Sequence, residues 1–512
     1  MKLIQSVCIV ICLIGVVAAE SLTDKVKHVI VLMLENRSFD HMLGFLKSLN
    51  ANIDGCSPGQ TGCDNHVDPL DHSSPKVTVD DSAVYVQVDP HHSIAWTTEQ
   101  IYGYPKNTQP PADAIPTMDG FIAAYVDDFS SGDTTGPTTI MKCFSPDHVP
   151  IMSNLSMEYA VFDGWFASVP GPTMVNRAYA ASATSHGMGT NDDKTIAKGL
   201  PQKTMFKQLL DMGLDYRVYF KDVPAVVQHK DMRRKEARDR YRLFDKFYED
   251  LDAGAIPEFT WLEPGYFSTP HQAASDQHPD HDVGVGEQLV KDVYEAVRAS
   301  SIWEETLLVI TYDEHGGFFD HVHPPYTNVP NPDGLNATDD PFDFTRLGVR
   351  VPSLLISPWV KKGTVIHSES DGESQYEHSS IVNTVVHKLF KANKAKGGRA
   401  PEFLTKRDEW AKSFEWIVDT ETSLRSDCPS QLPPVYLQQA AAGTTLPAQD
   451  GTLKLTALQK ELVLLVAGAT DDKRYGRNIT PESLGSWTEN EGFEYVRARM
   501  EGFLHGNVGE SE

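Results

Sequence analysis

The chain has 512 residues, of which 71 are acidic and 45 basic, and its formal charge at neutral pH is -26. A protein this acidic is not expected to bind nucleic acid through non-specific phosphate contacts or to attach permanently to an anionic membrane. The hydrophobic content of 40% and the charged content of 23% exclude fibrous and wholly disordered chains. We therefore expect a large folded protein that binds no nucleic acid and needs no obligate protein partner.

Residues 1–19 have the pattern of a cleaved secretory signal peptide. Lys2 provides a positive start, residues 7–17 form an apolar run, and the small residues Ala18 and Ala19 follow it. The alternative is a membrane anchor, but the run is shorter than the ~20 residues of a spanning helix. We expect cleavage near Ala19 and a mature protein in the secretory pathway, either secreted or in the lumen of the endoplasmic reticulum or another endomembrane compartment, and peripheral to membranes.

Five segments are typical of buried strands that end in polar residues, and helical patterns lie between them. Apolar strands that alternate with helices predict an α/β fold with a mostly parallel sheet flanked by helices. In such folds ligands bind at the carboxyl ends of the strands. The predicted strands are residues 28–36, 215–222, 259–264, 306–317 and 351–360, and the predicted helices are residues 202–212, 286–299 and 378–391.

The composition changes twice along the chain. Residues 48–150 are rich in Pro, Gly, Asp and Ser without sustained periodicity, which indicates a loop-rich insertion. After about residue 396 an extended linker is predicted at 431–451, with helical patterns on its far side at 455–468 and 481–504. We expect a signal peptide at 1–19, a main domain at 20–395 and a C-terminal extension at 396–512.

Four cysteines remain after removal of the signal peptide, and they permit three pairings. Cys56 and Cys63 enclose a turn-rich segment, so a local disulfide between them is favoured, which would leave Cys143 to pair with Cys428. Neither pair has the spacing of a metal site.

Glycosylation sequons occur at Asn36, Asn154, Asn336 and Asn478. We expect glycans at Asn154 and Asn336. Pro481 follows the last sequon closely.

Two pairs of polar residues end predicted strands. Glu35 and Asn36 offer hard oxygen ligands to a divalent cation, or they form a polar turn whose helix is capped by Ser38 or Asp40. Asp313 and Glu314 are a stronger signal, because solvated acids do not usually follow so apolar a run. Calcium, magnesium and manganese are the cations to consider, since carboxylate and amide oxygens suit all three. The neighbouring Asp320 and His321 either support such a site or have a structural role.

Thr173 precedes a predicted helix, after a turn at Gly171-Pro172. A threonine in this place is commonly a simple helix cap. The N-terminus of a helix also binds anions such as phosphate, and a metal near Thr173 would activate its hydroxyl as a nucleophile. From the residues alone we favour the cap.

The histidines that could act as general acids are His91, His92, His278, His281 and His378. Any one of them alone is more often a structural or surface residue. The spacing of His278 and His281 fits no standard zinc signature.

Together these motifs resemble the phosphoesterase family that contains plant non-specific phospholipase C, bacterial phosphatidylcholine-hydrolysing phospholipase C and related acid phosphatases. The resemblance spans roughly residues 25 to 420, and the plant-type branch is the most similar. It implies an alkaline-phosphatase-like fold, with residues 20–395 as the catalytic domain. It rests on LMLENRSFDHMLG, TMDGF, GPTMVNRAYAASATSHG, HPDHDVGVGEQLVKDVYEA, TYDEHGGFFDHV, RLGVRVPSLLISPWV and EHSSI.

Carried over by position, the family pattern makes Thr173 the nucleophile and argues against a glycan on Asn36. Bacterial relatives read DEND where this chain reads DEHG, so an acid is missing at Gly316. The metal's identity, number and affinity therefore stay open. The implied metal or phosphate ligands are Glu35, Asn36, Asp313 and Glu314, and the implied catalytic histidines are His92, His278 and His378.

The resemblance implies hydrolysis of a glycerophospholipid such as phosphatidylcholine in two displacements. Thr173 attacks phosphorus, a histidine such as His278 protonates the departing diacylglycerol, and water then hydrolyses the phosphothreonine to release the phosphorylated head group. Alternatives are a secreted acid phosphatase that acts on monoesters, and a non-catalytic lipid-binding glycoprotein.

A phospholipid substrate requires an apolar surface for transient contact with a membrane. Candidates are Trp96, Tyr102 and Tyr104 in the insertion, and a leucine stripe in the C-terminal extension. Such a stripe is more often a packing face than a membrane contact. The stripe comprises Leu455, Leu458, Leu462 and Leu465.

Overall fold

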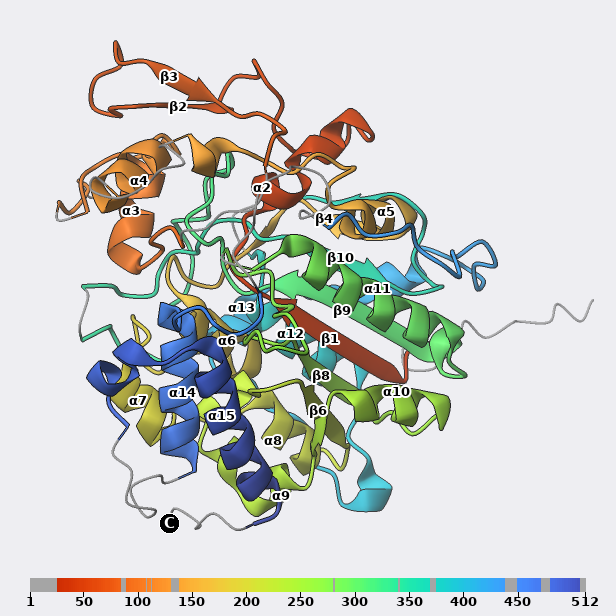
Figure 1. Cartoon of the computed structure of the whole chain (residues 1–512). Coiled ribbons are helices and arrows are strands. Elements are labelled where there is room, and N and C mark those ends of the chain that lie inside the picture. The colour runs from red at the N-terminus through yellow and green to blue at the C-terminus, as the bar shows by residue number, and fades with distance from the viewer. Residues whose placement is uncertain are drawn as a thin grey trace, which may run out of the picture.

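An eight-stranded sheet forms the centre of the computed structural model (Figure 1), with the strand order β11-β4-β10-β9-β1-β8-β6-β7. Within this sheet only β10 runs against its neighbours, so the predicted mostly parallel α/β sheet is confirmed. The structure describes residues 25–83, 89–106, 108–111, 113–129, 138–279, 281–338, 341–368, 374–437, 449–470 and 479–506. The strands are β1 (His28–Leu34), β4 (Ala160–Phe162), β6 (Tyr216–Phe220), β7 (Tyr241–Leu243), β8 (Phe259–Glu263), β9 (Thr306–Tyr312), β10 (Ser353–Ile356) and β11 (Thr364–Ile366).

Strand β1 lies in the middle of the sheet because its sequence HVIVLML is buried from its second residue to its last. It pairs in parallel with β8 on one side and with β9 on the other, and Leu34 lies opposite Tyr312. The residues that follow these strands, Glu35 and Asp313, therefore emerge side by side at the carboxyl edge of the sheet. This is the edge at which ligands bind in open α/β sheets.

The helices form two groups about the sheet. Helix α11 contacts α5 and α10 and crosses in front of β9 and β1 in Figure 1, whereas α6 contacts α8 and α12. The helices are α2 (Phe39–Leu43), α3 (Ile94–Tyr102), α4 (Phe121–Phe129), α5 (Pro150–Glu158), α6 (Thr173–Ser182), α7 (Asp193–Lys198), α8 (Met205–Asp211), α9 (Lys235–Arg238), α10 (Asp245–Asp252), α11 (Val283–Ala299), α12 (Ser379–Val382), α13 (Lys406–Trp410), α14 (Ala457–Ala469) and α15 (Glu489–Leu504). Shorter 3-10 helices are η1 (Gly44–Ser48), η2 (Thr139–Met141), η3 (Ala225–Gln228), η4 (Asp231–Arg233), η5 (Trp303–Glu305), η7 (Lys394–Lys396), η8 (Glu415–Asp419) and η11 (Pro481–Ser486), and η6 (Asn383–Leu389) is a π-helix.

The predicted insertion contains a hairpin of β2 (Asp64–His66) and β3 (Lys76–Thr78) beside α3 and α4 (Figure 1). A further pair, β5 (Trp165–Phe166) and β12 (Tyr376–Glu377), lies apart from the main sheet.

The disulfide prediction is half right. Cys56 and Cys63 are joined, with 5.7 Å between their Cα atoms. The predicted bond between Cys143 and Cys428 is wrong, because both are free. Each is buried in a different hydrophobic cluster: Cys143 lies with Cys56 and Cys63, and Cys428 lies in the large core around the sheet.

The C-terminal helices α14 and α15 pack against each other, and α14 packs against α7. All four leucines of the predicted stripe are buried, so the stripe is a packing face. In the described part of the chain, we find no helix with the length and apolar character that crossing a bilayer requires. The predicted signal peptide and the sequon at Asn478 lie outside the described residues.

The other sequons differ in exposure. Asn336 is exposed, Asn154 is half-buried in α5, and Asn36 is fully buried, in keeping with the argument against a glycan there. Glycans at Asn154 and Asn336 stay a prediction.

Candidate active site

Three strands deliver a carboxylate to one point at the carboxyl edge of the sheet. Glu35 follows β1, Asp313 follows β9, and Glu263 is the last residue of β8. All three side chains are fully buried. Buried carboxylates require compensating positive charge or protons, because the charged form is costly to desolvate.

Arg177 on helix α6 supplies part of that compensation. Its guanidinium approaches Glu35 at 2.6 Å, Glu263 at 3.0 Å and Asp313 at 3.2 Å. Burial opposes the charge on Arg177, but Glu35 and the other neighbours raise its pKa overall. Burial also raises the pKa of Glu35 well above its ordinary value, although Arg177 lowers it. One cation therefore serves three carboxylates and leaves the group short of positive charge.

Asn36 and Glu314 add two oxygens that accept no hydrogen bond from the residues that the structure describes. Asn36 has a positive φ of 68°, and its backbone N–H donates to Asp313 Oδ1 at 3.1 Å. Its side-chain Oδ1 and Glu314 Oε1 are buried and accept no hydrogen bond. Burial, reinforced by Asp313, raises the pKa of Glu314 well above its usual range. Unpaired buried oxygens are costly, so both atoms are suited to an ion or ligand.

Gly316 explains the missing acid of the DEHG sequence. Its φ of +65° is in the left-handed region, and a Cβ there would lie 2.1 Å from the carbonyl oxygen of Asn36. A side chain at residue 316 would therefore displace Asn36. The close approach of the backbones at Gly316 and Asn36 leaves no space for the side chain of an additional acid.

Thr173 is the first residue of α6 rather than its cap, since Pro172 holds the N-cap position. Its hydroxyl donates to Glu35 Oε2 at 3.4 Å, and the residue is only 2% exposed. Arg177 follows four residues later, on the same face of the helix, so one helix delivers both the hydroxyl and the guanidinium to the carboxylates. The free amides and positive dipole end of α6 favour a phosphate beside Thr173.

The predicted histidines lie around the same cluster but differ in their partners. His92 Nε2 lies 3.6 Å from Glu314 Oε1, and His278 Nε2 lies 3.6 Å from Asp89 Oδ2. His378 bonds through both ring nitrogens, to Asp313 O at 2.6 Å and to Trp165 Nε1 at 3.3 Å. Burial lowers the pKa of His378 to about 4. His378 is thus a neutral positioning residue, and His92 and His278 remain the candidate general acids.

The other two candidates each have a partner of their own. His91 is exposed and stacks on Trp96, and His281 bonds to Asp276 at 2.6 Å.

Sequence reasoning missed Asp89, Glu263 and Arg177. Asp89 Oδ1 accepts a hydrogen bond from the Asn36 side chain at 2.9 Å, which places it within the cluster. Glu263 could have been found from the sequence, because it is the last residue of an apolar strand. Glu35 and Asp313 were identified by the same signal, since each directly follows an apolar strand. Arg177 is a charge in a helix that is otherwise largely apolar, four residues after Thr173.

The C-terminal helices also reach this edge. Asn191 accepts a hydrogen bond from the Met174 amide at 3.0 Å and donates to Glu461 of α14 at 2.6 Å. Burial raises the pKa of Glu461 to about 8. Glu489 of α15 lies 3.4 Å from His281, and His281 is on the loop that also carries His278.

A second buried cluster lies behind α2. Arg350 contacts Asp320 at 2.8 Å and Asp40 at 3.2 Å, and His321 bonds to Asp40 at 2.6 Å. Asp40, Asp320 and His321 also place one donor each within 4.8 Å of one another, as do His66, His72 and Asp119 in the insertion. These contacts favour a structural role for Asp320 and His321, because Arg350 and His321 together balance the carboxylates of Asp40 and Asp320.

The cluster around Arg177 fits a divalent cation through its donor chemistry. Asn36 Oδ1 and Glu314 Oε1 are hard, buried oxygens that accept no hydrogen bond from a described residue, and the cluster has more carboxylates than arginines. The carboxylates of Glu35, Asp313 and Glu314 do not form a group with one oxygen each within 4.8 Å of one another among the described residues. A cation would therefore draw on the two unpartnered oxygens first.

Comparison with known proteins agrees with this geometry. A model of the phosphoesterase family matches residues 26–391, so the chain belongs to that family, whose members hydrolyse phosphate esters. The chain is 42% identical to non-specific phospholipase C6 of Arabidopsis thaliana over 487 residues, which cover 94% of this chain and 87% of that protein. Non-specific phospholipase C1 of the same plant is 41% identical over 94% of this chain and 86% of its own length.

A bacterial relative is more distant. Phospholipase C B of Mycobacterium tuberculosis is 29% identical over 69% of this chain and 72% of its own length. These matches confirm the resemblance that the sequence motifs indicated. A solved protein of the alkaline phosphatase superfamily from Vibrio parahaemolyticus covers 53% of this chain and 65% of its own at 11% identity, with a TM-score of 0.32, a likeness too slight to support an argument.

Proposed function

We propose that this protein is a phospholipase C that hydrolyses a glycerophospholipid, such as phosphatidylcholine, to diacylglycerol and a phosphorylated head group, with Thr173 as the nucleophile. One observation supports the role of Thr173 above the others: its hydroxyl lies at the N-terminus of α6 and donates to a buried carboxylate, Glu35. A hydroxyl beside both a proton acceptor and an anion site is arranged for in-line attack on phosphorus. The names of the plant and bacterial relatives support the phospholipid as substrate.

In the first displacement the Thr173 oxygen forms a bond to phosphorus and its proton passes to Glu35. The bond from phosphorus to the glycerol oxygen breaks, and His278 protonates that oxygen, so diacylglycerol leaves. In the second displacement a water oxygen bonds to phosphorus and gives its proton to His278. The bond to Thr173 breaks, Glu35 returns the proton to Thr173, and the phosphorylated head group leaves.

Arg177 and His378 hold this arrangement in place. Arg177 fixes Glu35, Glu263 and Asp313 relative to one another through its ion pairs. His378 fixes the backbone at Asp313 through its 2.6 Å hydrogen bond. A divalent cation held by Asn36 and Glu314 would supply the positive charge that the phosphate and the carboxylates share.

The remaining parts of the proposal concern location. The mature protein acts in the secretory pathway or outside the cell, and it contacts membranes transiently. Exposed apolar residues of the insertion, Leu70 at 61% and Ile115 at 70%, line a pocket with Tyr102 and Tyr104 and support a lipid-facing surface there. Trp96 does not line that pocket, and it stacks on His91 instead.

The test measures diacylglycerol released from phosphatidylcholine in mixed micelles, with calcium, magnesium and manganese each supplied. Thr173→Ala should reduce turnover by at least about 10³-fold, and Thr173→Ser should retain part of it. Thr422→Ala, at an exposed position, is the matched control and should leave turnover unchanged.

A head group labelled at phosphorus should also appear on Thr173 when the reaction is quenched. Turnover of a soluble monoester without release of diacylglycerol would make the protein a phosphatase. Diacylglycerol release that survives Thr173→Ala would remove Thr173 from the mechanism.

A further inference from the structure

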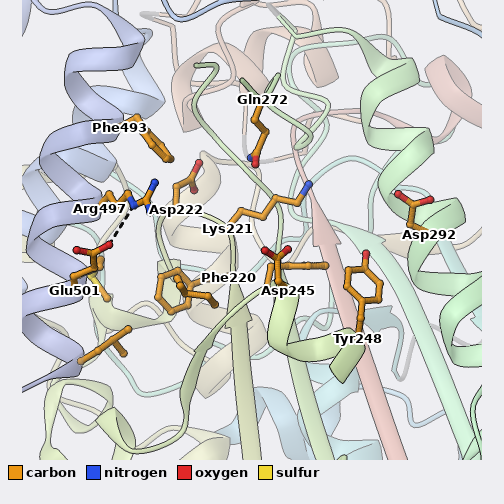
Figure 2. Close-up of a pocket in the computed structure, with 14 residues that line it drawn as sticks. Phe220, Lys221, Asp222, Asp245, Tyr248, Gln272, Asp292, Phe493, Arg497 and Glu501 are labelled. Atoms are coloured by element: carbon orange, nitrogen blue, oxygen red, sulfur yellow. Dashed lines mark hydrogen bonds and ion pairs between the residues drawn. The ribbon is translucent and has the colours of Figure 1, made fainter. Parts of the chain in front are cut away.

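A pocket of about 370 Å³ lies between the end of β6, helix α10, helix α11 and the C-terminal helix α15 (Figure 2). None of the residues that line it belongs to the cluster around Arg177. Its lining combines apolar side chains, among them the buried Phe220, Phe244 and Met500, with charged and polar ones; we call these three buried side chains its floor. We call it the α15 pocket. A pocket of this size with an apolar floor and a few charged groups has the form of a small-molecule site.

Lys221 and Arg497 are the positive groups that line the α15 pocket, and Lys221 lies in the middle of the residues drawn in Figure 2. It follows β6 directly and is half-buried. Its Nζ donates to Ser275 Oγ at 3.3 Å and lies 5.6 Å from the ring centroid of Phe244. Among the residues that the structure describes, no carboxylate lies within 4.0 Å of this ammonium group. A partly desolvated ammonium without a counter-ion attracts an anion.

Two carboxylates lie on the side of the pocket formed by α10 and α11. Asp245 begins α10 and Asp292 lies on α11, and both are exposed. Neither forms an ion pair with a described residue, although the buried Asp222 most strongly, and then these two, act on Lys221 at longer range. Tyr248 of α10 lines the pocket on the same side (Figure 2). Across the pocket, Arg497 and Glu501 of α15 pair with each other at 3.2 Å.

This arrangement of charge selects against simple ions. A plain anion that reached Lys221 would be repelled by Asp245 and Asp292, and a plain cation at the two carboxylates would be repelled by Lys221. A ligand with both charges satisfies all three groups. The aromatic rings of Phe244 and Tyr248 add a surface on which an ammonium group is favoured.

We propose that the α15 pocket is a second ligand site that binds a zwitterionic phosphate ester, with its phosphate group against Lys221 and its ammonium group against Asp245 and Asp292. Phosphocholine has this chemistry as a soluble ester, and so does the head group of phosphatidylcholine in a membrane. The inference does not depend on the role of Thr173, because it concerns binding at residues outside the catalytic cluster.

Occupancy of the α15 pocket has a structural consequence. The ligand bridges α10 and α11, which lie against the main sheet, to α15, which contributes Phe493 and Arg497 to the opposite wall. Bound ligand should therefore slow the local opening of α15, since it binds only the docked helix. Hydrogen exchange of residues 489–504 reports this directly.

The experiment uses the full chain with Thr173→Ala, so that no substrate is consumed. Phosphocholine near saturation should slow exchange in residues 489–504 by at least about threefold, whereas choline or inorganic phosphate at the same concentration should have a smaller effect. Adding Lys221→Met should abolish the protection. Lys246→Met is the matched control, because Lys246 is exposed on α10, pairs with Glu249 and does not line the pocket.

Asp292→Asn provides a second variant on an exposed helix surface, and it should reduce the preference for phosphocholine over inorganic phosphate. Vesicles of phosphatidylcholine distinguish the two sources of the ligand. Protection by vesicles that requires Lys221 would assign the site to membrane lipid, and protection by soluble phosphocholine alone would assign it to the free ester. Equal protection in the Lys221→Met protein, or no protection by either source, would overturn the proposal.

Discussion

Two buried clusters in this molecule are each built of carboxylates around one arginine, and they differ in whether the protein completes them. Around Arg350, the groups Asp40, Asp320 and His321 are all hydrogen-bonded, and none leaves an unpartnered buried atom among the described residues. Around Arg177, buried oxygens of Asn36 and Glu314 accept nothing.

The two clusters differ in how the charge of their carboxylates is balanced. The Arg350 cluster has a second protonatable group, since Asp40 and Asp54 raise the pKa of His321 to about 10 against the effect of burial. In the Arg177 cluster, burial lowers the pKa of His378 to about 4 and raises the pKa of Glu35 and Glu314. A closed network stabilises the fold, and an incomplete network is ready to bind a ligand.

Replacing Arg177 should give the largest effect. We expect Arg177→Met to reduce phospholipid turnover by at least about 10²-fold, because Glu35, Glu263 and Asp313 lose their common partner. The protein should also be destabilised, and divalent cations should restore part of its unfolding temperature by binding the exposed carboxylates. Calorimetry with and without calcium, magnesium or manganese checks this. A loss of stability that no divalent cation reduces would contradict the inference that the Arg177 cluster can bind a cation.

Arg350→Met should separate stability from chemistry. Removing one partner of a buried ion pair costs about 3–5 kcal/mol, because the remaining charges are left uncompensated. We expect a loss of this size in the free energy of unfolding, measured with denaturant, and no rescue by divalent cations. Turnover per folded molecule should stay within about twofold of the parent. A large fall in turnover at unchanged stability would mean that the Arg350 cluster takes part in catalysis.

His321 gives the Arg350 cluster a dependence on pH. Its folded pKa of about 10 exceeds the ordinary value of 6.5, so its stabilisation is fully present below pH 6.5 and is lost as the pH rises toward 10. We expect His321→Gln to destabilise the protein by about 2–3 kcal/mol at pH 6 and by much less at pH 10. Thermal unfolding at several pH values tests this, and a loss that is the same at both ends of the range would argue against a charged His321.

Glu461 should give the smallest effect. Since burial raises its pKa to about 8, the side chain is mostly protonated at pH 6, and Glu461→Gln preserves both its charge and its shape there. We expect the turnover of the variant to be within about twofold of the parent at pH 6. Above pH 8 the parent's Glu461 ionises and the variant's glutamine side chain does not, so turnover should fall less in the variant than in the parent. A large deficit at pH 6 would show that the carboxyl group itself is needed.

The sequence predicted the parts of this structure that depend on continuous patterns. All five predicted strands are present, because each is a run of apolar residues long enough to be buried on both faces. The short strands β4, β7 and β11 were missed, since a strand of three residues gives no periodic signal. The predicted disulfide between Cys143 and Cys428 was wrong because these two cysteines were paired only by elimination. The spacing of cysteines in the sequence does not show how far apart they lie in the fold.

The site was predicted where polar residues end strands and missed where tertiary contacts decide. Glu35 and Asp313 were identified from their place after apolar runs, and the same signal at Glu263 was overlooked. Asp89 joins the cluster from a loop with no pattern of its own. The roles of Thr173 and the three histidines came from family resemblance, and they stay predictions that the experiments above address.

The contacts of α14 and α15 with the catalytic edge have a consequence for biosynthesis. A ribosome makes the residues of the catalytic cluster well before it makes Glu461 and Glu489. The contact of Glu461 with Asn191 and the contact of Glu489 with His281 can therefore form only after the last helices are made. Until then the Asn191 amide and the loop that carries His278 lack their final partners. The newly made chain therefore has an unfinished hydrolytic centre until its last two helices have formed.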